Sequence, residues 1–452
     1  MKEKKAVIAG AGLVGSLWAI FLARRGYEID VYERRPDMRQ RGYSGGRSIN
    51  LAMSRRGWKA IERAGIKSLI EPHAIPMKGR MIHSPEGGLA FQPYGKEGDA
   101  IYSVSRGGLN LELLKAAGDF PNVRLHFDQG CREVDLETNT AVFEQVQTGV
   151  QTNVQTPLLF GADGAFSAVR GSLMKTPRFD YSQEYLSHSY KELSIPPAPG
   201  GGFLMEKNAL HIWPRHQFML IALPNADGSF TCTLFLAHEG PSSFAELQTD
   251  GDVEAFFQRH FPDALAMMPT LLEDFRNNPT GLLLTVRCRP WEYGKRLLLL
   301  GDAAHAIVPF YGQGMNAGFE DCTILDELAS EYGENWEKII ERFNRERIKD
   351  GNAVADLALR NFIEMRDLVA DPRFLLRKKI AAHLHLKYGD AFLPSYSMVS
   401  FSDTAYSVAL QAADEQDRLL DRMLEIKGIE ENLDRPEVDR LFEQWRKDGQ
   451  GF

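Results

Sequence analysis

Three places in this 452-residue sequence combine an acidic residue with glycines in the way that a nucleotide site requires. The most extensive runs from Leu297 to Asp321, where four leucines are followed by Gly301, Asp302 and a glycine-rich loop. A carboxylate can accept hydrogen bonds from sugar hydroxyls, and glycines let backbone N–H groups come close to a ligand. This stretch therefore predicts one wall of a nucleotide-cofactor site, although alone it would suit an ordinary strand–loop–helix connection equally well.

The second place is the segment GAGLVG, which begins at Gly10. Gly10 suits the tight turn after a strand, Gly12 lets the backbone approach a pyrophosphate, and Gly15 lets the following helix pack closely. Glu33 lies about 20 residues further on, where a carboxylate can accept hydrogen bonds from ribose hydroxyls. The pattern predicts a dinucleotide site, but it does not distinguish FAD from NAD.

The third place is LLFGADGAFSAVR, which begins at Leu158. After an apolar run, Asp163 and Gly164 form a turn, and Ser167 is a suitable residue to begin a helix. An isolated Asp-Gly turn of this kind is most often a structural corner. Because it repeats the order of strand, aspartate, glycine and helix found at the other two places, we interpret it as part of the same cofactor site.

Other polar residues could also belong to a binding site, but each could equally well be an ordinary surface or core residue. Arg47 and Asn50 follow an Arg- and Gly-rich loop and could bind a phosphate or a flavin, or simply be solvated. Arg80 lies in the middle of a short predicted strand, where most arginines face solvent. Residues 361–365 place an asparagine, a glutamate and a methionine on one helix face, which usually means a core methionine beside a solvated polar pair.

The elements that must position these residues alternate between strand and helix. A strand over Lys5–Ala9, a helix over Leu13–Arg25 and a strand over Tyr27–Tyr32 surround the first glycine loop. The alternating and aromatic runs between Tyr185 and Leu236 are broken by Pro-Gly turns and predict an antiparallel sheet. Such a sheet would suit the floor of a substrate pocket. After Asp321 the pattern is that of amphipathic helices.

Composition narrows the class of protein. The chain is long enough for two or three domains, and 44% hydrophobic with 25% charged residues is ordinary for a soluble globular protein. A net charge of −8 argues against nucleic acid or an anionic membrane as a partner. The four cysteines contain no CxxC pair, which argues against a disulfide framework or a zinc site and favours a reducing compartment.

The N-terminus superficially resembles a signal peptide, because lysines precede an apolar run. Its glycines fit a nucleotide loop instead, and the run continues through Arg24 and Arg25 into a further strand without a plausible cleavage site. No other segment approaches the roughly 20 apolar residues that a membrane span needs. We therefore expect neither a signal peptide nor a transmembrane segment.

The order of the three motifs resembles that of the single-component FAD-dependent aromatic hydroxylases, which share the para-hydroxybenzoate hydroxylase fold. GAGLVG lies near the start, GADGAFSAVR lies in mid-chain, and LLLLGDAAHAIVPFYGQGMNAG lies late. Further segments are similar to the kynurenine 3-monooxygenase branch of that family and span nearly the whole chain. They are RSINLAMSRRG, GRMIH, FQPYG, SVSR, SYKELSI, VPFYGQGMNAGFEDC and RNFIEMRD.

The resemblance implies an α/β fold in which an FAD-binding Rossmann-like domain carries an inserted, mainly antiparallel β-sheet substrate domain and a helical C-terminal region. We expect the FAD-binding domain over residues 1–180, with small β insertions near 75–105. The substrate sheet would occupy 181–280, followed by a return to the FAD-binding domain and a long helix over 281–370. Residues 371–452 would form a helical region that covers the active site.

The resemblance also implies the site residues. Arg80 and Tyr94 would hold a substrate carboxylate, since a buried arginine can form a bidentate, charge-assisted pair with it. Asn361 and Tyr396 would line the same site. Near the substrate ring we expect Glu364, Met365, Pro309 and Phe310. The residues that would contact FAD are Gly10, Gly12, Val14, Gly15, Tyr32, Glu33, Arg34, Arg35, Ala52, Arg106, Cys131, Asp163, Asp302, Gly314, Met315 and Asn316, with Asp302 on the ribitol and Met315 and Asn316 at the isoalloxazine.

The implied reaction converts L-kynurenine, NADPH and oxygen into 3-hydroxy-L-kynurenine, NADP and water through a hydroperoxide of the reduced flavin. It would be a step of tryptophan degradation towards quinolinate and NAD. Tightly but non-covalently bound FAD would carry the chemistry, with NADPH as a transient reductant, so no side chain is expected to act as a proton carrier and no metal is expected. Two alternatives stay open: a hydroxylase of the same fold with another phenolic or quinone-precursor substrate, and a non-catalytic flavin redox sensor.

The C-terminal segment is charged, whereas eukaryotic members of the family end in a membrane-anchoring segment. The resemblance therefore implies a soluble, cytoplasmic form similar to the bacterial members. The expected partners are small molecules, with a homodimer as an open option. The basic helix expected over 373–388 suits a lid or a domain-packing element better than a membrane-surface helix in so acidic a chain.

Overall fold

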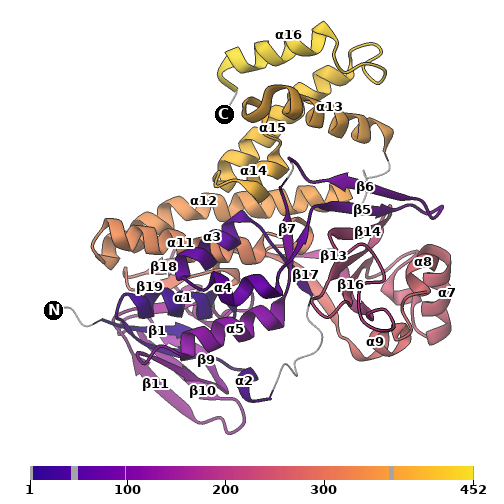
Figure 1. The fold of residues 1–452 in the computed structure, drawn as a ribbon. Helices are drawn as coiled ribbons and strands as arrows, with labels where there is room; N and C mark the ends of the chain where they lie inside the picture. Colours follow the sequence, from indigo (N-terminus) through magenta and orange to yellow (C-terminus); the bar gives the residue numbers. More distant parts are fainter. Residues whose placement is uncertain (1–3, 42–48, 97, 366–370, 451–452) are drawn as a thin grey trace.

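The computed structural model describes residues 4–41, 49–96, 98–365 and 371–450, which form three regions (Figure 1). The first is a six-stranded sheet with its helices, the second is a seven-stranded sheet with short helices, and the third consists of helices near the C-terminus. The expected α/β fold, with an inserted, mainly antiparallel sheet and a helical C-terminal region, is confirmed.

The six-stranded sheet brings the three acidic glycine-containing motifs to one edge. Its strands, in spatial order, are β18 (Glu292–Tyr293), β19 (Leu297–Leu299), β12 (Leu159–Gly161), β1 (Lys5–Ala9), β2 (Glu28–Tyr32) and β8 (Val123–His126). All neighbouring strands run parallel except β18 and β19. Because β1, β12 and β19 are adjacent and parallel, the loops that follow them leave the sheet at the same end.

Helices cover this sheet, and the strands are apolar because the helices bury them. Helix α1 (Leu13–Arg24) is buried over most of its length, because α5 (Arg106–Gly118) and α11 (Gly314–Glu331) pack against it. The remaining helices of this region are α2 (Met38–Arg41), α3 (Arg55–Ala64), α4 (Lys67–Ile70), α6 (Ala168–Leu173) and α10 (Asp302–His305). Two small sheets complete it, β11 (Gln151–Gln155) with β10 (Thr140–Gln145) and β9 (Gln129–Asp135), and β3 (Asn50–Met53) with β7 (Ile101–Ser105) and β4 (Ile75–Met77).

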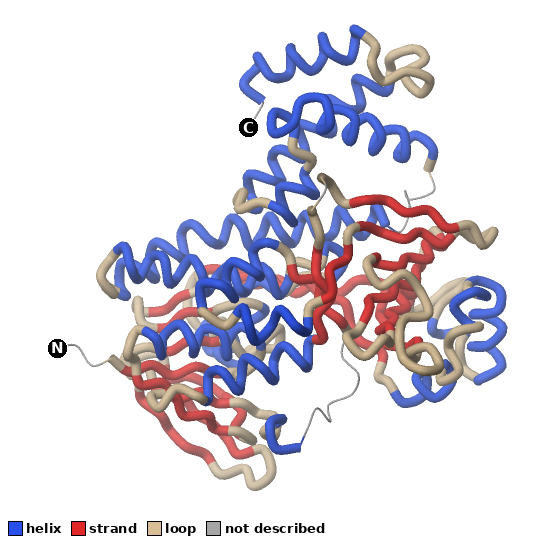
Figure 2. The backbone as a smooth tube through the Cα atoms, in the orientation of Figure 1, coloured by secondary structure: helices blue, strands red, loops and turns tan. Residues whose placement is uncertain are grey.

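The seven-stranded sheet is the centre of the second region (Figure 2). Its order is β17 (Thr280–Arg289), β13 (Asp180–Ile195), β16 (Phe230–Ala237), β15 (Phe218–Pro224), β14 (Ala209–Arg215), β5 (Gly79–His83) and β6 (Leu89–Pro93). Every pair is antiparallel except β14 with β5, which brings a strand from early in the chain into this sheet. One face packs on α7 (Asp250–His260), α8 (Pro262–Leu265) and α9 (Leu271–Asn277) to form an apolar core rich in phenylalanine.

The C-terminal helices lie above α12 (Trp336–Ile363) and close to β5 and β6 (Figure 1). They are α13 (Pro372–Tyr388), α14 (Ser395–Phe401), α15 (Tyr406–Leu424) and α16 (Pro436–Trp445). Helices α13, α15 and α16 share a small apolar core of their own, and α14 and α15 pack on α12 through another. In the part of the chain that is described, none of the helices combines the length and the apolar character that crossing a membrane requires.

Candidate cofactor and substrate site

A cavity of about 590 Å³ lies where the loops after β1, β12 and β19 face the seven-stranded sheet. This volume is within the range of pockets that hold cofactors and small ligands. The predicted residues that line it are Gly10, Gly12, Val14, Tyr32, Glu33, Arg34, Arg35, Ala52, Arg80, Arg106, Cys131, Asp163, Asp302, Pro309, Phe310, Gly314, Met315, Met365 and Tyr396. Five other predicted residues, described below, lie outside the lining: Gly15, Tyr94, Asn316, Asn361 and Glu364.

The glycine loop after β1 presents bare backbone to the cavity. Gly10 has a φ of 99°, and its N–H donates to the carbonyl of Tyr32 at 2.7 Å. Gly12 precedes α1 without a side-chain cap, and no atom lies within 4 Å of where its Cβ would be. Gly15 contributes differently, since a Cβ there would lie 1.9 Å from the carbonyl oxygen of Gly10. The loop thus leaves the positive N-terminus of α1 facing the cavity, which suits a pyrophosphate.

Glu33 fixes this loop from the end of β2. Its carboxylate accepts hydrogen bonds from the N–H of Ala11 at 2.9 Å and from the backbone and side chain of Arg35 at 3.0 and 2.8 Å. Burial acts to raise the pKa of Glu33, but the hydrogen bonds from Arg35 outweigh it and hold the pKa below its usual range. Glu33 is therefore an ionised acceptor at the cavity wall.

Asp163 has a structural role in the loop after β12 as well as a place in the cavity wall. Its carboxylate accepts the hydroxyl of Ser167 and the N–H groups of Ala168 at 2.7 Å and Val169 at 3.2 Å, so it caps the first turn of α6. Burial raises its pKa. The Asp-Gly motif therefore fixes the direction in which α6 leaves the sheet.

Asp302 begins α10 directly after Gly301, whose φ is 56°. Among the described residues, no hydrogen bond or ion pair engages its carboxylate, and it lines the cavity. The loop is held from behind by Asp321, which is fully buried and accepts from the N–H of Gly301 at 3.0 Å, from His305 at 2.7 Å and from Arg347 at 2.7 Å. Asp302 is thus an open acceptor on a rigid support.

Asn316 lies behind the cavity wall. It is fully buried, its Oδ1 accepts from the N–H of Ser54 at 2.9 Å, and its Nδ2 donates to the carbonyls of Ala52 and Gly312 at 2.9 and 2.8 Å. Its amide therefore ties β3 to the glycine-rich loop before α11. Asn316 thus supports the cavity wall without lining the cavity.

The far end of the cavity carries a half-buried cation next to two phenols. Arg80 projects from β5, and its guanidinium lies 5.6 Å from the ring of Tyr94 and 5.0 Å from the ring of Tyr396. Within the described residues, the buried Arg80 Nε and the buried Tyr94 hydroxyl have no hydrogen-bond partner. Burial raises the pKa of Tyr94 well above its usual value, so its hydroxyl stays protonated. Together they offer donors that suit a carboxylate.

Aromatic side chains line the space between this cation and the loop after α10. Phe310 packs against Phe235 at 4.8 Å and against Phe362 at 4.4 Å between ring centroids. Tyr311 stacks with Tyr396 at 5.5 Å. These rings form a slot that suits a flat aromatic ligand.

Polar residues at the C-terminal end of α12 hold the lining of this slot in place without lining it themselves. Asn361 donates to the carbonyl of Phe310 at 2.6 Å and to the sulfur of Met365 at 3.3 Å, so it fixes two lining residues from behind. Glu364 instead forms an ion pair with Lys378 of α13 at 3.0 Å. The structure thus brings Met365 to the cavity, places Asn361 behind the cavity wall and turns Glu364 towards the C-terminal helices.

Gln129 was not found from sequence patterns, whereas Asn50 and Arg47 were named there as candidates. Gln129 lines the cavity with a buried side-chain oxygen that has no partner among the described residues. Asn50 lines it too, but its amide binds Ser103, Pro224 and Asn225 and therefore joins β3 and β7 to the seven-stranded sheet. Arg47 lies outside the described residues. The only sequence signal for Gln129 was its place just before Cys131 at the start of a strand.

A buried histidine pair lies on the opposite face of the strand that carries Arg80. His83 of β5 and His211 of β14 are 2.9 Å apart between ring nitrogens, and the second nitrogen of each ring faces Asp263 or the carbonyl of Glu206, both at 2.8 Å. Burial lowers the pKa of His211 to about 4, and the nearby His83 acts in the same direction.

The low pKa of His211 makes stability depend on pH. Between its unfolded pKa near 6.5 and its folded pKa of about 4, the unfolded chain binds a proton that the folded protein does not. The free energy of unfolding should therefore fall as pH is lowered, by roughly 2 kcal/mol from this residue between pH 7 and 5. Urea unfolding at pH 7 and at pH 5 measures this fall in the free energy of unfolding. His211→Gln, which keeps a donor for Glu206 but does not titrate, should show a smaller loss; equal losses would contradict the prediction.

The sequence pattern of the family described as FAD binding domain matches residues 3–358. A kynurenine 3-monooxygenase of Myxococcus xanthus is 49% identical over 434 residues, which are 96% of this chain and 93% of that protein. A kynurenine 3-monooxygenase of Christiangramia forsetii is 46% identical and covers 97% of this chain and 98% of its own. The pig relative of the same name is 44% identical over 89% of this chain and 85% of its own.

Solved structures with the same fold include p-nitrophenol 4-monooxygenase from Pseudomonas putida, with a TM-score of 0.67 and 18% identity over 90% of this chain and 96% of that one. The tetrameric 2-methyl-3-hydroxypyridine-5-carboxylic acid oxygenase has a TM-score of 0.66 and 18% identity, and covers 89% of this chain and 98% of its own. At this identity the likeness concerns the fold alone.

Proposed function

This chain belongs to the kynurenine 3-monooxygenase family of FAD-binding hydroxylases, and from this premise we propose that it converts L-kynurenine to 3-hydroxy-L-kynurenine with NADPH and oxygen. The membership confirms the expectation of an FAD-dependent monooxygenase. It also favours this activity over the two alternatives, a hydroxylase for another phenolic or quinone-precursor substrate and a non-catalytic flavin sensor.

The observation that supports this substrate best is Arg80. Its guanidinium lies in a largely buried, aromatic-lined pocket beside the protonated hydroxyl of Tyr94, and its Nε has no protein partner among the described residues. Among the described residues no carboxylate forms an ion pair with Arg80, and a cation in such a pocket is costly unless a ligand supplies the anion. L-kynurenine has a carboxylate at one end and a flat aminophenyl ketone at the other, so its ring would occupy the slot beside Phe310.

The residues around the other end of the cavity fit FAD. The uncapped N-terminus of α1, with open space at Gly12, would hold the pyrophosphate. Glu33 and Asp302 would accept from sugar and ribitol hydroxyls, and Ala52 and Met315 would lie at the isoalloxazine. When bound, FAD supplies the redox chemistry of oxygen activation.

The tasks left to the chain are positioning and exclusion of water. The substrate's aromatic amine already activates the neighbouring ring carbon, so no strong protein base is needed. His305 is 3% exposed and hydrogen-bonded to Asp321, and burial raises the pKa of Tyr311 well above its usual value. Neither is therefore assigned as a proton carrier. The rings of Phe310, Tyr311 and Tyr396 would keep the reacting ring fixed and dry.

We expect L-kynurenine to stimulate NADPH oxidation by the flavin-loaded protein at least tenfold, because substrate positioning should gate reduction. The measurement is NADPH absorbance with and without L-kynurenine, together with mass spectrometry of the product for one added oxygen atom. Stimulation by a phenol instead would favour the first alternative, and no stimulation by either would favour the flavin sensor.

The cellular compartment and the oligomeric state of the enzyme are separate proposals. All four cysteines are free thiols, and three of them are buried, which supports a reducing compartment such as the cytoplasm. A homodimer is the assembly we propose, and light scattering of the flavin-loaded protein tests it.

A further inference from the structure

We propose that Arg56 is a positioning residue for the substrate site: it fastens residues 399–404 to helix α11 and so holds Tyr396 of α14 next to Arg80. This inference rests on the proposed function and adds a residue of α3 that does not itself line the cavity. No pattern around Arg56 in the sequence distinguishes it from its neighbour Arg55.

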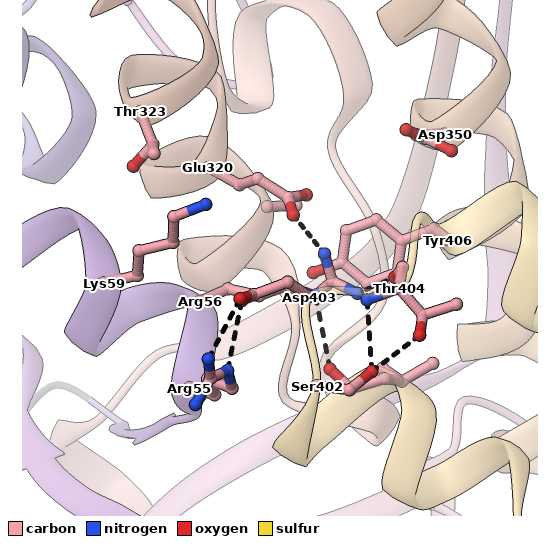
Figure 3. A network of polar contacts seen from close by, with 12 residues as sticks. Arg55, Arg56, Lys59, Glu320, Thr323, Asp350, Ser402, Asp403, Thr404 and Tyr406 are labelled. Atoms are coloured by element: carbon pink, nitrogen blue, oxygen red, sulfur yellow. Dashed lines mark hydrogen bonds and ion pairs between the residues drawn. The ribbon is translucent and has the colours of Figure 1, made fainter. Parts of the chain in front are cut away.

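Arg56 is a buried junction between three segments (Figure 3). It is 2% exposed, and its guanidinium lies over the ring of Tyr406 at 4.1 Å. Its nitrogens donate to the carboxylate of Glu320 in α11, to the carbonyl of Thr404 and, at 3.3 Å, to the carbonyl of Val399. The planar fork of an arginine is required to reach three directions at once, which a lysine cannot do.

In α11, the partner of Arg56 is linked through further ion pairs to the loop that carries Asp302. Glu320 also forms an ion pair with Arg347 at 2.7 Å, and Arg347 donates to Asp321 at 2.7 Å. Asp321 in turn accepts the N–H of Gly301, directly before Asp302. The position of residues 399–404 is therefore set relative to the same buried charges that hold the cofactor side of the cavity.

On its other side, Arg56 fixes the position of α14. This helix is seven residues long and has no side-chain cap at its N-terminus. Its start is held by Gln416, which accepts from the N–H of Ser395 at 3.2 Å. The C-terminal end of α14 is held by Arg56 through Val399. Since Tyr396 lies within this short helix, a shift of its C-terminal end displaces the ring that stacks between Arg80 and Tyr311.

The next helix, α15, also has an attachment that does not involve Arg56, although the ring of its first residue, Tyr406, lies under the Arg56 guanidinium. Asp350 of α12 accepts from the N–H and hydroxyl of Ser407, at 2.9 and 2.7 Å, and so fixes the first turn of α15. Loss of Arg56 should therefore loosen residues 399–404 while α15 stays docked. This separates a positioning role from a general role in folding.

Arg55 provides a matched control. It is the preceding residue of α3 and forms an ion pair at 3.0 Å with Asp403, in the same segment that Arg56 holds (Figure 3). The two side chains are 57% and 43% exposed, so the pair lies at the surface and should contribute little. Arg55→Met and Arg56→Met thus remove the same functional group one residue apart.

The test compares flavin-loaded wild type, Arg55→Met, Arg56→Met and Arg56→Lys. Arg56→Met should raise the KM for L-kynurenine at least tenfold and at least double the hydrogen peroxide released per NADPH, with kcat changed less than KM. Arg56→Lys should give a smaller rise in both quantities, because it keeps the charge for Glu320 but loses the fork. Arg55→Met should stay within twofold of wild type. A merely structural role would lower the unfolding midpoint without changing KM or peroxide release.

Hydrogen exchange supplies a readout that does not need activity. Amides of residues 398–404 should exchange at least tenfold faster in Arg56→Met than in Arg55→Met, while the first turns of α15 stay protected. If wild type fails to hydroxylate L-kynurenine, the proposed function is wrong, and the exchange result alone decides the role of Arg56. Unchanged KM, peroxide release and exchange in a folded Arg56→Met overturn the inference. Should that variant not fold, wild-type values in Arg56→Lys overturn it.

Discussion

Replacing Arg80 with alanine should raise the KM for L-kynurenine about 100-fold or more while FAD stays bound. Removing one partner of a buried, hydrogen-bonded charge pair costs about 3 kcal/mol, which corresponds to a factor of this size. The physical reason is that Arg80 Nε and the Tyr94 hydroxyl lack protein partners among the described residues, so the substrate carboxylate would be their counterpart. Steady-state kinetics and the flavin absorbance of the purified variant measure both parts of the prediction.

Two controls make this result specific to the carboxylate. Lys78→Ala removes an exposed cation just before the same strand and should change KM less than twofold. An analogue of L-kynurenine that lacks the carboxylate should bind wild type and Arg80→Ala about equally weakly. If the analogue loses as much affinity as L-kynurenine does, Arg80 supports the pocket rather than binding the carboxylate. Loss of flavin from Arg80→Ala would place the residue at the cofactor instead.

Sequence patterns could predict that most of the proposed cofactor residues lie at one end of the cavity, because their positions follow from local rules, and their contact with FAD stays a prediction. A parallel strand that ends in glycine, with an acidic residue beyond it, directs a helix N-terminus and a carboxylate towards the same edge of a sheet. The adjacency of β1, β12 and β19 then brings three such places together.

The substrate half depended on the family resemblance, because its geometry is not local. Arg80 in β5 meets Tyr94, 14 residues later, and Tyr396, from the C-terminal helices, only after β5 has paired with β14. A mid-strand arginine is usually solvated, and the strand itself does not reveal which face is buried. Pattern reasoning alone therefore favoured solvent for Arg80.

The buried charge network was missed for a related reason. Arg56, Glu320 and Arg347 each lie on an amphipathic helix, where a charged residue is ordinarily interpreted as part of the solvated face. Arg56 and Arg347 are buried and Glu320 is partly buried, because three helices and the segment before α15 converge on them. Convergence of segments more than 250 residues apart leaves no periodic signal in the sequence.

Gly12→Ala should leave the folded protein without cofactor as stable as wild type but weaken FAD binding by about 100-fold. No atom lies within 4 Å of the added Cβ, and the φ of Gly12 is −71°, so alanine fits the protein alone. A Cβ at this position would instead meet the pyrophosphate, which needs close approach to the backbone. Thermal unfolding of the cofactor-free protein and titration with FAD separate the two effects.

Gly10→Ala should instead destabilise the protein even without cofactor, and the contrast between the two variants tests where the cofactor lies. Its Cβ would lie 2.4 Å from the carbonyl oxygen of Ala162 at a φ of 99°, so the loops after β1 and β12 must separate even without FAD. We expect a loss of about 2 kcal/mol or more in the free energy of unfolding of the cofactor-free protein. Gly171→Ala, in open space on α6, should change neither property much. If Gly12→Ala binds FAD as tightly as wild type, the pyrophosphate does not lie at the N-terminus of α1, and the assignment of this half of the cavity is wrong.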